Sequence, residues 1–270
     1  MFPGATADRS AADYVVVGAP LDVSTTFQPG TRFGPDRIRR FARTFDDYDH
    51  HTERFFTDLG VSDHGDVNAW DDAREYLDFL GSVLRGVLDD DDVPLLLGGE
   101  HTVTIAGVEA IEPDVFVCLD AHLDLREEYA GNPWSHATVT RHVLEIADRA
   151  VILGARTGSR EEWERAAAED VTVVPPGDVD DWEPDFADES VYLSVDVDGA
   201  DLGFAPGTGT MEPFGLDPGQ MRDVVAAVGP VADAFDVVEV NDRDDGQAAA
   251  LAGKLLRTFV YQHAAGTDTA

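Results

Sequence analysis

The chain has 270 residues, of which 54 are Asp or Glu and 19 are Lys or Arg, so its formal charge is −35. Nucleic acids and anionic membranes carry charge of the same sign, which excludes them as partners. The hydrophobic content of 43% is sufficient for a sizeable core, and we expect a single domain over residues 1–270.

The sequence contains one cysteine, Cys118, so an internal disulfide is excluded. The first ten residues lack the basic-then-apolar pattern of a signal peptide. No apolar run approaches the roughly 20 residues that a membrane helix needs. We therefore expect a cytoplasmic protein in which Cys118 has a packing role.

The acidic residues are distributed along the whole chain, and Lys254 is the only lysine. Repulsion at this net charge opposes compaction in dilute buffer. At about 1 M salt the Debye length falls to about 3 Å, which screens most of the repulsion between exposed charges. We interpret the composition as that of a halophilic protein, and an acidic protein of an ordinary cytoplasm is the alternative.

Apolar segments with strand character alternate with segments of helical spacing. Strands are predicted at residues 14–18, 55–59, 93–98, 115–119, 151–154, 171–174, 191–193 and 236–241. Helices are predicted at residues 35–43, 71–88, 103–111, 136–147, 160–169, 217–228 and 246–263, and a polar loop at residues 58–66. This alternation is typical of an α/β fold with a mostly parallel central sheet and helices on both faces.

Three of the predicted strands run into potential metal ligands, which are His101, Asp120, His122, Asp124, Asp196 and Asp198. After strand 115–119 the ligand residues alternate with Ala121 and Leu123. In an extended backbone, side chains with this period of two lie on one face. Because sites in open α/β sheets lie at the carboxyl ends of the strands, we expect all six side chains to converge there.

Four carboxylates and two imidazoles suit a hard or borderline divalent ion, and no cysteine ligand favours structural zinc. Four acids packed together repel one another unless cations neutralise them. Carboxylates can bridge two divalent ions about 3.5–4 Å apart, and such a pair lowers the pKa of a bound water. The residues therefore indicate metal-assisted hydrolysis.

The sequence resembles the ureohydrolase family, which includes arginase, agmatinase and formiminoglutamase. The resemblance rests on three motifs in the right order and spacing: Gly-Gly-Glu-His at 98–101, Asp-Ala-His-Leu-Asp at 120–124 and Ser-Val-Asp-Val-Asp at 194–198. Loops 29–35 and 205–210 are also similar to loops of the family. The resemblance implies an arginase-like three-layer αβα fold and a site for two Mn²⁺ ions.

The resemblance also divides the six ligands into three pairs: His101 with Asp124 on one ion, His122 with Asp198 on the other, and Asp120 with Asp196 bridging both. It implies that Asp124 helps to stabilise the tetrahedral intermediate of hydrolysis. Glu100 and Thr102 are departures, because Asp and Ser are commoner beside the ligand histidine.

Two further residues are similar to catalytic residues of the family. His136 is similar to the histidine that protonates the leaving amine, and a helix-cap histidine is the alternative. Glu239 is similar to the acid that binds the substrate guanidinium, whose forked donors match a carboxylate. A surface acid is the alternative for Glu239, but an acid inside an apolar strand needs a partner.

Loops 125–132 and 135–138 are most similar to archaeal agmatinases. We therefore expect a small guanidino substrate, with agmatine hydrolysed to urea and putrescine in polyamine biosynthesis. Arginase, guanidino-acid hydrolase and formiminoglutamase activities remain alternatives. A metal-binding homologue without catalysis and a one-zinc deacetylase on a related fold are alternatives of other classes. The resemblance further implies a homo-oligomer, either a trimer or a hexamer.

We expect the protein to lose structure when salt is removed, because the repulsion among its acidic residues is then unscreened. Circular dichroism should show a weaker helical signal in low-salt buffer than at about 1 M salt, and the melting temperature should fall. An unchanged spectrum and melting temperature after desalting would contradict the halophilic interpretation.

Overall fold

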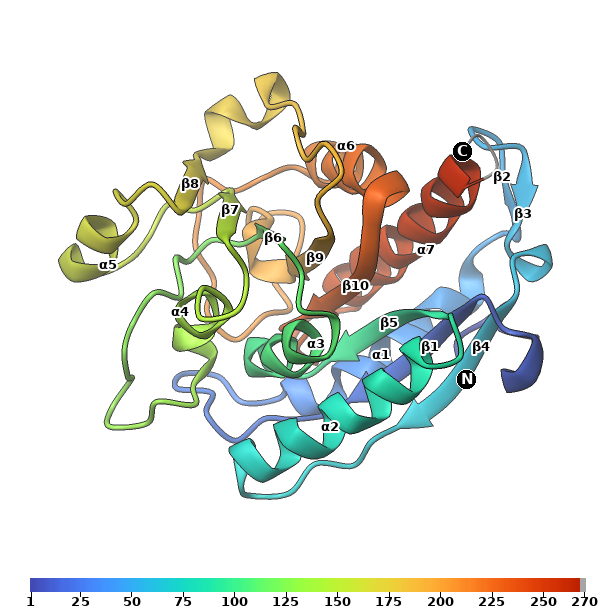
Figure 1. Ribbon diagram of the computed structural model, residues 1–270, viewed down its shortest axis with the longest axis horizontal. Coiled ribbons are helices and arrows are strands. Elements are labelled where there is room, and N and C mark those ends of the chain that lie inside the picture. Colours follow the sequence, from blue (N-terminus) through green and yellow to red (C-terminus); the bar gives the residue numbers. More distant parts are fainter. Residues whose placement is uncertain (268–270) are drawn as a thin grey trace.

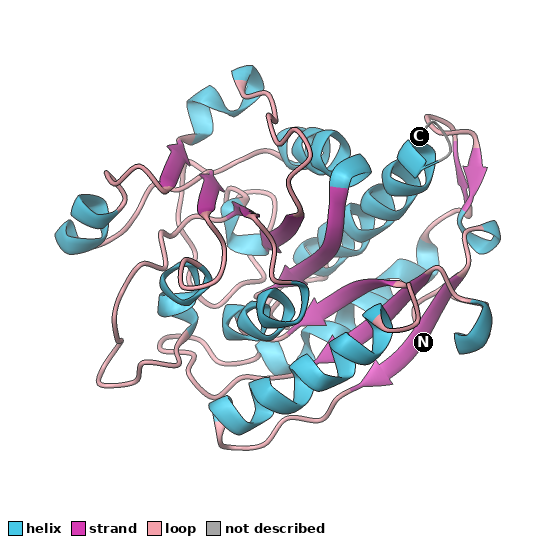
Figure 2. Ribbon diagram, in the orientation of Figure 1, coloured by secondary structure: helices cyan, strands magenta, loops and turns pink. Residues whose placement is uncertain are grey.

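The computed structural model describes residues 1–267 and contains a central eight-stranded sheet between two layers of helices (Figures 1 and 2). The strand order is β4-β1-β5-β10-β9-β6-β7-β8, and every neighbouring pair is parallel. In chain order these strands are β1 (Tyr14–Ala19), β4 (Val61–Asp66), β5 (Val93–Gly98), β6 (Val115–Leu119), β7 (Arg149–Leu153), β8 (Val171–Val174), β9 (Val191–Asp196) and β10 (Ala232–Val238). The predicted three-layer αβα architecture is confirmed.

Helices pack on both faces of the sheet. One face is covered by α2 (Ala73–Leu88), α3 (Thr104–Ile111) and α4 (Val139–Val143). The other is covered by α1 (Gly34–Phe41), α6 (Pro218–Val228) and α7 (Gln247–Thr267). The short helix α5 (Arg160–Arg165) lies near the β8 edge (Figure 1). Among the described residues, no helix has the length and apolarity that crossing a membrane requires.

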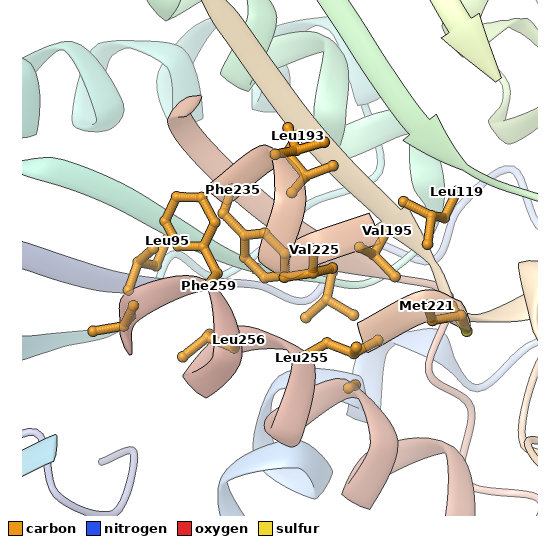
Figure 3. Packing of buried hydrophobic residues seen from close by; sticks show 14 of the residues in the cluster. Leu95, Leu119, Leu193, Val195, Met221, Val225, Phe235, Leu255, Leu256 and Phe259 are labelled. Carbon is orange, nitrogen blue, oxygen red and sulfur yellow. The ribbon is translucent and has the colours of Figure 1, made fainter. Parts of the chain in front are cut away.

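The core consists of two large apolar clusters, one on each face of the sheet. Side chains of a strand alternate between the faces, so each central strand contributes to both clusters. Figure 3 shows Leu193 and Phe235 of the sheet against Val225 of α6 and Phe259 of α7. The rings of Phe235 and Phe259 are stacked, with centroids 4.9 Å apart. Because both faces are covered, the central strands are buried along their whole length.

The predicted strand at 55–59 and the predicted polar loop at 58–66 are both wrong. Only Arg54–Phe55 (β3) is extended, in a short antiparallel pair with β2 (Tyr48–Asp49), and a 3-10 turn follows at Phe56–Asp58. The sheet strand is β4 instead. Since β4 is an edge strand, its outer half is polar, and the buried carboxylate of Asp63 in it is paired with Arg39. An edge strand lacks the apolar run that marks a central strand.

Two helices are shorter than predicted. Residues 136–147 begin with a 3-10 turn at His136–Thr138, and the helix α4 that follows ends at Val143. The helix predicted at 160–169 ends at Arg165. In the second case the chain must turn back within five residues to enter β8 at Val171, which leaves no room for another helical turn.

The strand order brings distant parts of the sequence to one edge. Strands β5, β10, β9 and β6 are consecutive neighbours, so the segments that follow their carboxyl ends lie side by side. The segment after β5 is held by its backbone: Gly99 N donates to Ala19 O at 2.7 Å, and Glu239 N donates to Gly99 O at 2.8 Å. The turn at Gly99 is therefore packed between the ends of β1 and β10.

Replacing Gly99 by Ala should destabilise the fold by about 1–3 kcal/mol, the usual cost of overpacking. A Cβ at this position would lie 2.0 Å from the backbone oxygen of Leu21, which cannot move aside as a flexible side chain would. Gly86→Ala is the matched control, because Gly86 is in α2 with open space around it. That control should gain about 0.5–1 kcal/mol from the better helix former. Equal effects of the two substitutions in urea unfolding would contradict the prediction.

Candidate metal centre

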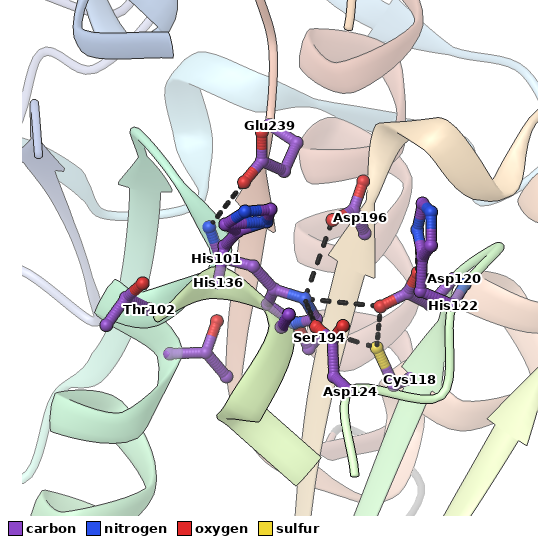
Figure 4. Close-up of polar contacts among 12 residues, drawn as sticks. His101, Thr102, Cys118, Asp120, His122, Asp124, His136, Ser194, Asp196 and Glu239 are labelled. Atoms are coloured by element: carbon purple, nitrogen blue, oxygen red, sulfur yellow. Dashed lines mark hydrogen bonds and ion pairs between the residues drawn. The ribbon is translucent and has the colours of Figure 1, made fainter. Parts of the chain in front are cut away.

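Each of the four central strands ends beside the same point, and the predicted ligands follow these ends (Figure 4). His101 follows β5, Asp120 directly follows β6 and Asp196 is the last residue of β9. Glu239 directly follows β10, which lies between β5 and β9. The convergence of these side chains therefore follows from the strand order.

His101 directs the Nδ1 edge of its ring toward three carboxylates. Nδ1 lies 3.0 Å from Asp124 Oδ2, 3.2 Å from Asp120 Oδ2 and 3.5 Å from Asp196 Oδ2. The ring is buried, and Nδ1 has no hydrogen-bond partner among the described residues. A buried imidazole nitrogen that faces several carboxylate oxygens is suited to hold a divalent cation together with them.

His122 faces two carboxylates, and one of them, Asp120, is also faced by His101. Its Nδ1 is 3.0 Å from Asp198 Oδ2 and 3.5 Å from Asp120 Oδ1. Asp120 thus presents one oxygen to each histidine, which is the arrangement of a carboxylate that bridges two ions. Potential ligand atoms of Asp120, His122 and Asp198 all lie within 4.8 Å of one another.

The predicted reason for the convergence of residues 120–124 is wrong, because this segment is not extended. β6 ends at Leu119, and the residues that follow bend away from the strand direction. His122 N donates to Asp120 Oδ1 at 2.7 Å, and Asp124 has a φ of 51°, in the left-handed region that Asp tolerates better than most residues. A tight turn, and not the period of a strand, brings the three ligands together.

Asp196 and Asp198 are held by a similar turn after β9. Asp198 lies in the 3-10 turn Val197–Gly199, and its backbone N donates to Asp196 Oδ1 at 2.8 Å. Asp198 also accepts hydrogen bonds from Ala121 N at 3.2 Å and from Thr210 Oγ1 at 3.1 Å. The glycine-rich loop 205–210 therefore reaches the centre through Thr210.

The four aspartates of the centre are almost completely buried and repel one another. Burial, and next the charge of Asp120, raise the pKa of Asp124 to about 7. Burial together with the charges of Asp198 and Asp120 also raises the pKa of Asp196. Positive charge at this point would relieve the repulsion, so the donor set fits a pair of hard or borderline divalent ions.

Cys118 lies next to the centre, with its Sγ 3.9 Å from Asp120 Oδ2. Its Sγ is 3.8 Å from Nε2 of His101, whereas the carboxylates face Nδ1. Burial raises the pKa of the Cys118 thiol to about 12, which disfavours the thiolate that binds metals. The expected packing role agrees with its position in β6, where it joins an apolar cluster.

Glu239 is only 4% exposed, and Oε1 accepts a hydrogen bond from His101 N at 2.8 Å. Burial, and then the charges of Glu100 and Asp198, raise the pKa of Glu239. Since it is buried, the surface-acid alternative is wrong. One backbone hydrogen bond does not offset the cost of burying a charged carboxylate, so Glu239 is suited to a cationic partner.

His136 lies in the 3-10 turn before α4, where Ser135 and not His136 is the N-cap. Its backbone N donates to Ser24 Oγ at 3.0 Å, and its Nε2 is 3.2 Å from Thr26 Oγ1. Burial, and then positive charge on His101 and His122, lower the pKa of His136 to about 4. The imidazole is therefore neutral at neutral pH.

Glu100 has a structural role that sequence reasoning missed. Its buried carboxylate accepts hydrogen bonds from the backbone N atoms of Ser24 and Thr25, at 2.7 and 3.1 Å, and from the hydroxyl of Thr102 at 3.0 Å. Ser24 Oγ donates to the same carboxylate at 2.8 Å. Glu100 thus fixes the loop that contacts His136. This role could have been predicted from the sequence, because Glu100 is an acid that directly follows the apolar segment 93–99.

A cavity of about 290 Å³ opens beside the centre. It is lined by Asp124 and His136 of the centre and by Arg126, Tyr129 and Glu162. The guanidinium of Arg126 is 3.1 Å from a carboxylate oxygen of Glu162 and lies 5.0 Å from the ring centroid of Tyr129. A small molecule in this cavity would contact both the predicted ligands and this ion pair.

Together, the parallel α/β sheet and the cluster of histidines and aspartates at its carboxyl edge fit the class of hydrolases that use divalent metal ions. Residues 12–261 match the model of the arginase family. The chain belongs to the arginase family and is a ureohydrolase-type hydrolase.

Named relatives are similar over nearly the whole chain. The chain is 35% identical to the N(1)-aminopropylagmatine ureohydrolase of Thermococcus kodakarensis over 91% of this chain and 88% of that protein. It is 34% identical to the agmatinase of Pyrococcus horikoshii over 93% of this chain and 92% of that protein. The crystal structure of the agmatine ureohydrolase of Thermoplasma volcanium has a TM-score of 0.94 at 32% identity, covering 99% of this chain and 95% of that one.

We expect Asp120→Ala to abolish the binding of divalent metal, because Asp120 faces both histidines of the centre. The measurement is the metal content of protein dialysed after loading with Mn²⁺. Asp223→Ala is the control, since Asp223 is an exposed acid on α6 that is paired with Arg222. Metal content of the Asp120 variant equal to that of the control would refute the assignment.

Proposed function

We propose that the protein hydrolyses agmatine to urea and putrescine with the help of two Mn²⁺ ions. The observation that carries this proposal is the convergence of two histidines and four aspartates at the ends of neighbouring strands, beside a buried glutamate. Membership of the arginase family and the relatives named agmatinase support the same activity. The oligomeric state and the single domain over residues 1–270 stay predictions.

The six predicted ligands would hold the two ions in the pairs implied by the family resemblance. Support comes from the distances, since His101 is nearest to Asp124, His122 is nearest to Asp198, and Asp120 lies between the two histidines. When bound, the ions supply Lewis acidity that activates water for attack on the guanidinium carbon. Carboxylate-rich sites suit Mn²⁺, which is why we propose this metal.

Glu239 binds the guanidinium group of the substrate in this proposal. Its burial makes a cationic partner favourable, and the fork of a guanidinium matches the two oxygens of a carboxylate. Asp124 lines the cavity and would stabilise charge as the trigonal carbon becomes tetrahedral.

His136 moves the proton that the leaving amine needs. Because its lowered pKa of about 4 favours the neutral imidazole, His136 must first accept a proton before it can donate one. Thr26 Oγ1 lies at hydrogen-bond distance from Nε2, so it can keep the ring oriented toward the cavity that both residues line. The proton passes from the attacking water through His136 to the departing nitrogen.

The tail of the substrate is the least constrained part of the proposal. The relative in Thermococcus kodakarensis is named for N(1)-aminopropylagmatine, so the aminopropyl derivative of agmatine is a second candidate substrate. Glu162, which lines the cavity, is already paired with Arg126, so it is not a free carboxylate for an ammonium group. Tyr129 offers an aromatic face to an amine tail in the same cavity.

The test is a panel of substrates assayed for urea release, at about 1 M salt with added Mn²⁺. The panel contains agmatine, N(1)-aminopropylagmatine, arginine and a guanidino acid, with formiminoglutamate assayed for its own products. We expect kcat/KM for agmatine to exceed that for arginine and for the guanidino acid at least tenfold. The reason is that Arg126, the arginine that lines the described cavity, is already paired with Glu162 and is not free to bind the carboxylate of these substrates.

His136→Asn serves as the control for a contaminating activity. This variant should lose about 10²- to 10⁴-fold in kcat, the usual contribution of a positioned proton-transfer group, while its Mn²⁺ content stays that of the wild type. Higher kcat/KM for arginine or the guanidino acid would sink the agmatine proposal. Full activity of the variant would sink the role of His136.

A further inference from the structure

Asp236 in β10 is a completely buried acid at the centre of a hydroxyl network. Its carboxylate accepts hydrogen bonds from Ser194 Oγ at 2.6 Å, Thr104 Oγ1 at 2.8 Å and Tyr192 Oη at 2.8 Å. These three residues are also buried. Burial raises the pKa of Asp236, and the three hydrogen bonds act in the opposite direction. Such a network is stable in a core because every member has a partner.

The network is asymmetric, and only one of its members reaches the metal centre. Thr104 and Tyr192 share the Oδ2 atom of Asp236, whereas Ser194 alone bonds to Oδ1. Ser194 Oγ also lies 3.4 Å from Nε2 of His101 (Figure 4). Because the single hydroxyl hydrogen of Ser194 is donated to Asp236, its oxygen can only accept a hydrogen from the imidazole.

This donor count determines the tautomer of His101 in its neutral form, which is the form that binds a metal. When Nε2 carries the hydrogen, the lone pair of Nδ1 is free, and Nδ1 is the atom that faces the three carboxylates. The same contact restricts rotation of the ring about its axis. A neutral imidazole with this tautomer is the form that binds a metal through Nδ1.

We propose that Asp236 and Ser194 are positioning residues that prepare His101 to bind its metal ion. Metal-binding histidines usually donate their other ring N–H to an acceptor, and removing that acceptor typically weakens metal binding 10- to 100-fold. The inference rests on the proposed function, because it takes His101 as a ligand. It adds the chain Asp236–Ser194–His101, whose first two members lie behind the ligand and contribute no ligand atom themselves.

Cys118 is the competing acceptor, because its Sγ is 3.8 Å from the same Nε2. A thiol is a weak acceptor compared with a hydroxyl oxygen, and the longer distance weakens it further. Cys118 Sγ and Ser194 Oγ thus both lie near Nε2 of His101, at 3.8 and 3.4 Å. A Cys118→Ala variant therefore tests whether the thiol, and not the hydroxyl, holds the ring.

The experiment is a titration of the metal-free full-length protein with Mn²⁺ alone, giving a dissociation constant for each of two equivalents. Ser194→Ala should weaken one equivalent 10- to 100-fold and leave the other within threefold. Thr104→Val is the matched control: it removes one buried hydroxyl from the same carboxylate, and within the described network it is Ser194, and not Thr104, that contacts His101. Thr104→Val and Cys118→Ala should each stay within threefold of the wild type.

Equal losses in Ser194→Ala and Thr104→Val would overturn the proposal, since a general loosening of the core would then explain both. A loss in Cys118→Ala without a loss in Ser194→Ala would also overturn it. Melting temperatures of the metal-free variants show whether the two hydroxyl deletions cost similar stability, so that only the contact with His101 distinguishes them.

Asp236→Asn and the double variant Asp236→Asn with Ser194→Ala provide a second test. Both residues act through one contact, so the double variant should bind Mn²⁺ no more than threefold more weakly than the weaker single variant. If the fold-loss in Mn²⁺ affinity of the double variant equals the product of the two single losses, the proposal is overturned. His101→Ala separates this inference from the function on which it rests: unchanged Mn²⁺ binding there refutes the ligand role itself. If His101→Ala weakens Mn²⁺ binding while the Ser194 and Asp236 variants bind like the wild type, only the positioning roles are refuted.

Discussion

Mutual repulsion among buried carboxylates is the constraint on which this structure depends. Asp120, Asp124, Asp196 and Asp198 are all at most 6% exposed and gather at one edge of the sheet. Buried carboxylates this close together cannot all be ionised unless positive charge compensates them. The pKa of Asp124 is raised for this reason, first by burial and then by the charge of Asp120. Two divalent cations would remove the repulsion, and in the proposed function the same cations would activate water, so one physical cause would underlie both metal binding and catalysis.

The scaffold holds these charges in place mainly with backbone groups. Backbone N–H groups of His122 and Asp198 bond to Asp120 and Asp196, and that of His101 bonds to Glu239. In these contacts only the accepting carboxylate is a side chain, because the donors are backbone groups that the fold already holds in place. A shell of buried side chains lies behind them, in which Glu100 fixes the loop beside His136 and Asp236 connects to His101 through Ser194. His136, the proposed proton-transfer group, and His101, a proposed ligand, are thus each supported by a separate buried acid.

Family membership and substrate choice depend on different parts of the molecule. The match to the arginase family covers residues 12–261, a range that contains the whole sheet and all three ligand motifs. In the proposed function the tail of the substrate would meet the cavity wall, where Arg126 pairs with Glu162 and lies over the ring of Tyr129. Loops in general tolerate change more readily than the elements they connect, whereas the sheet edge beside which the predicted ligands lie is part of the fold.

The amino-acid sequence alone was sufficient for the fold class, the family and the identity of the side chains that meet, because apolar periodicity and short ligand motifs are local signals. Prediction from the sequence failed where the conformation of a segment depends on contacts with residues far away in the chain. The polar edge strand β4 is recognisable only beside β1, and the turn at residues 120–124 replaces the expected extended backbone. The partners of Glu100 and Asp236 come from segments 76 and 42 residues away. Only the order of the strands, which long-range packing decides, brings those groups into contact.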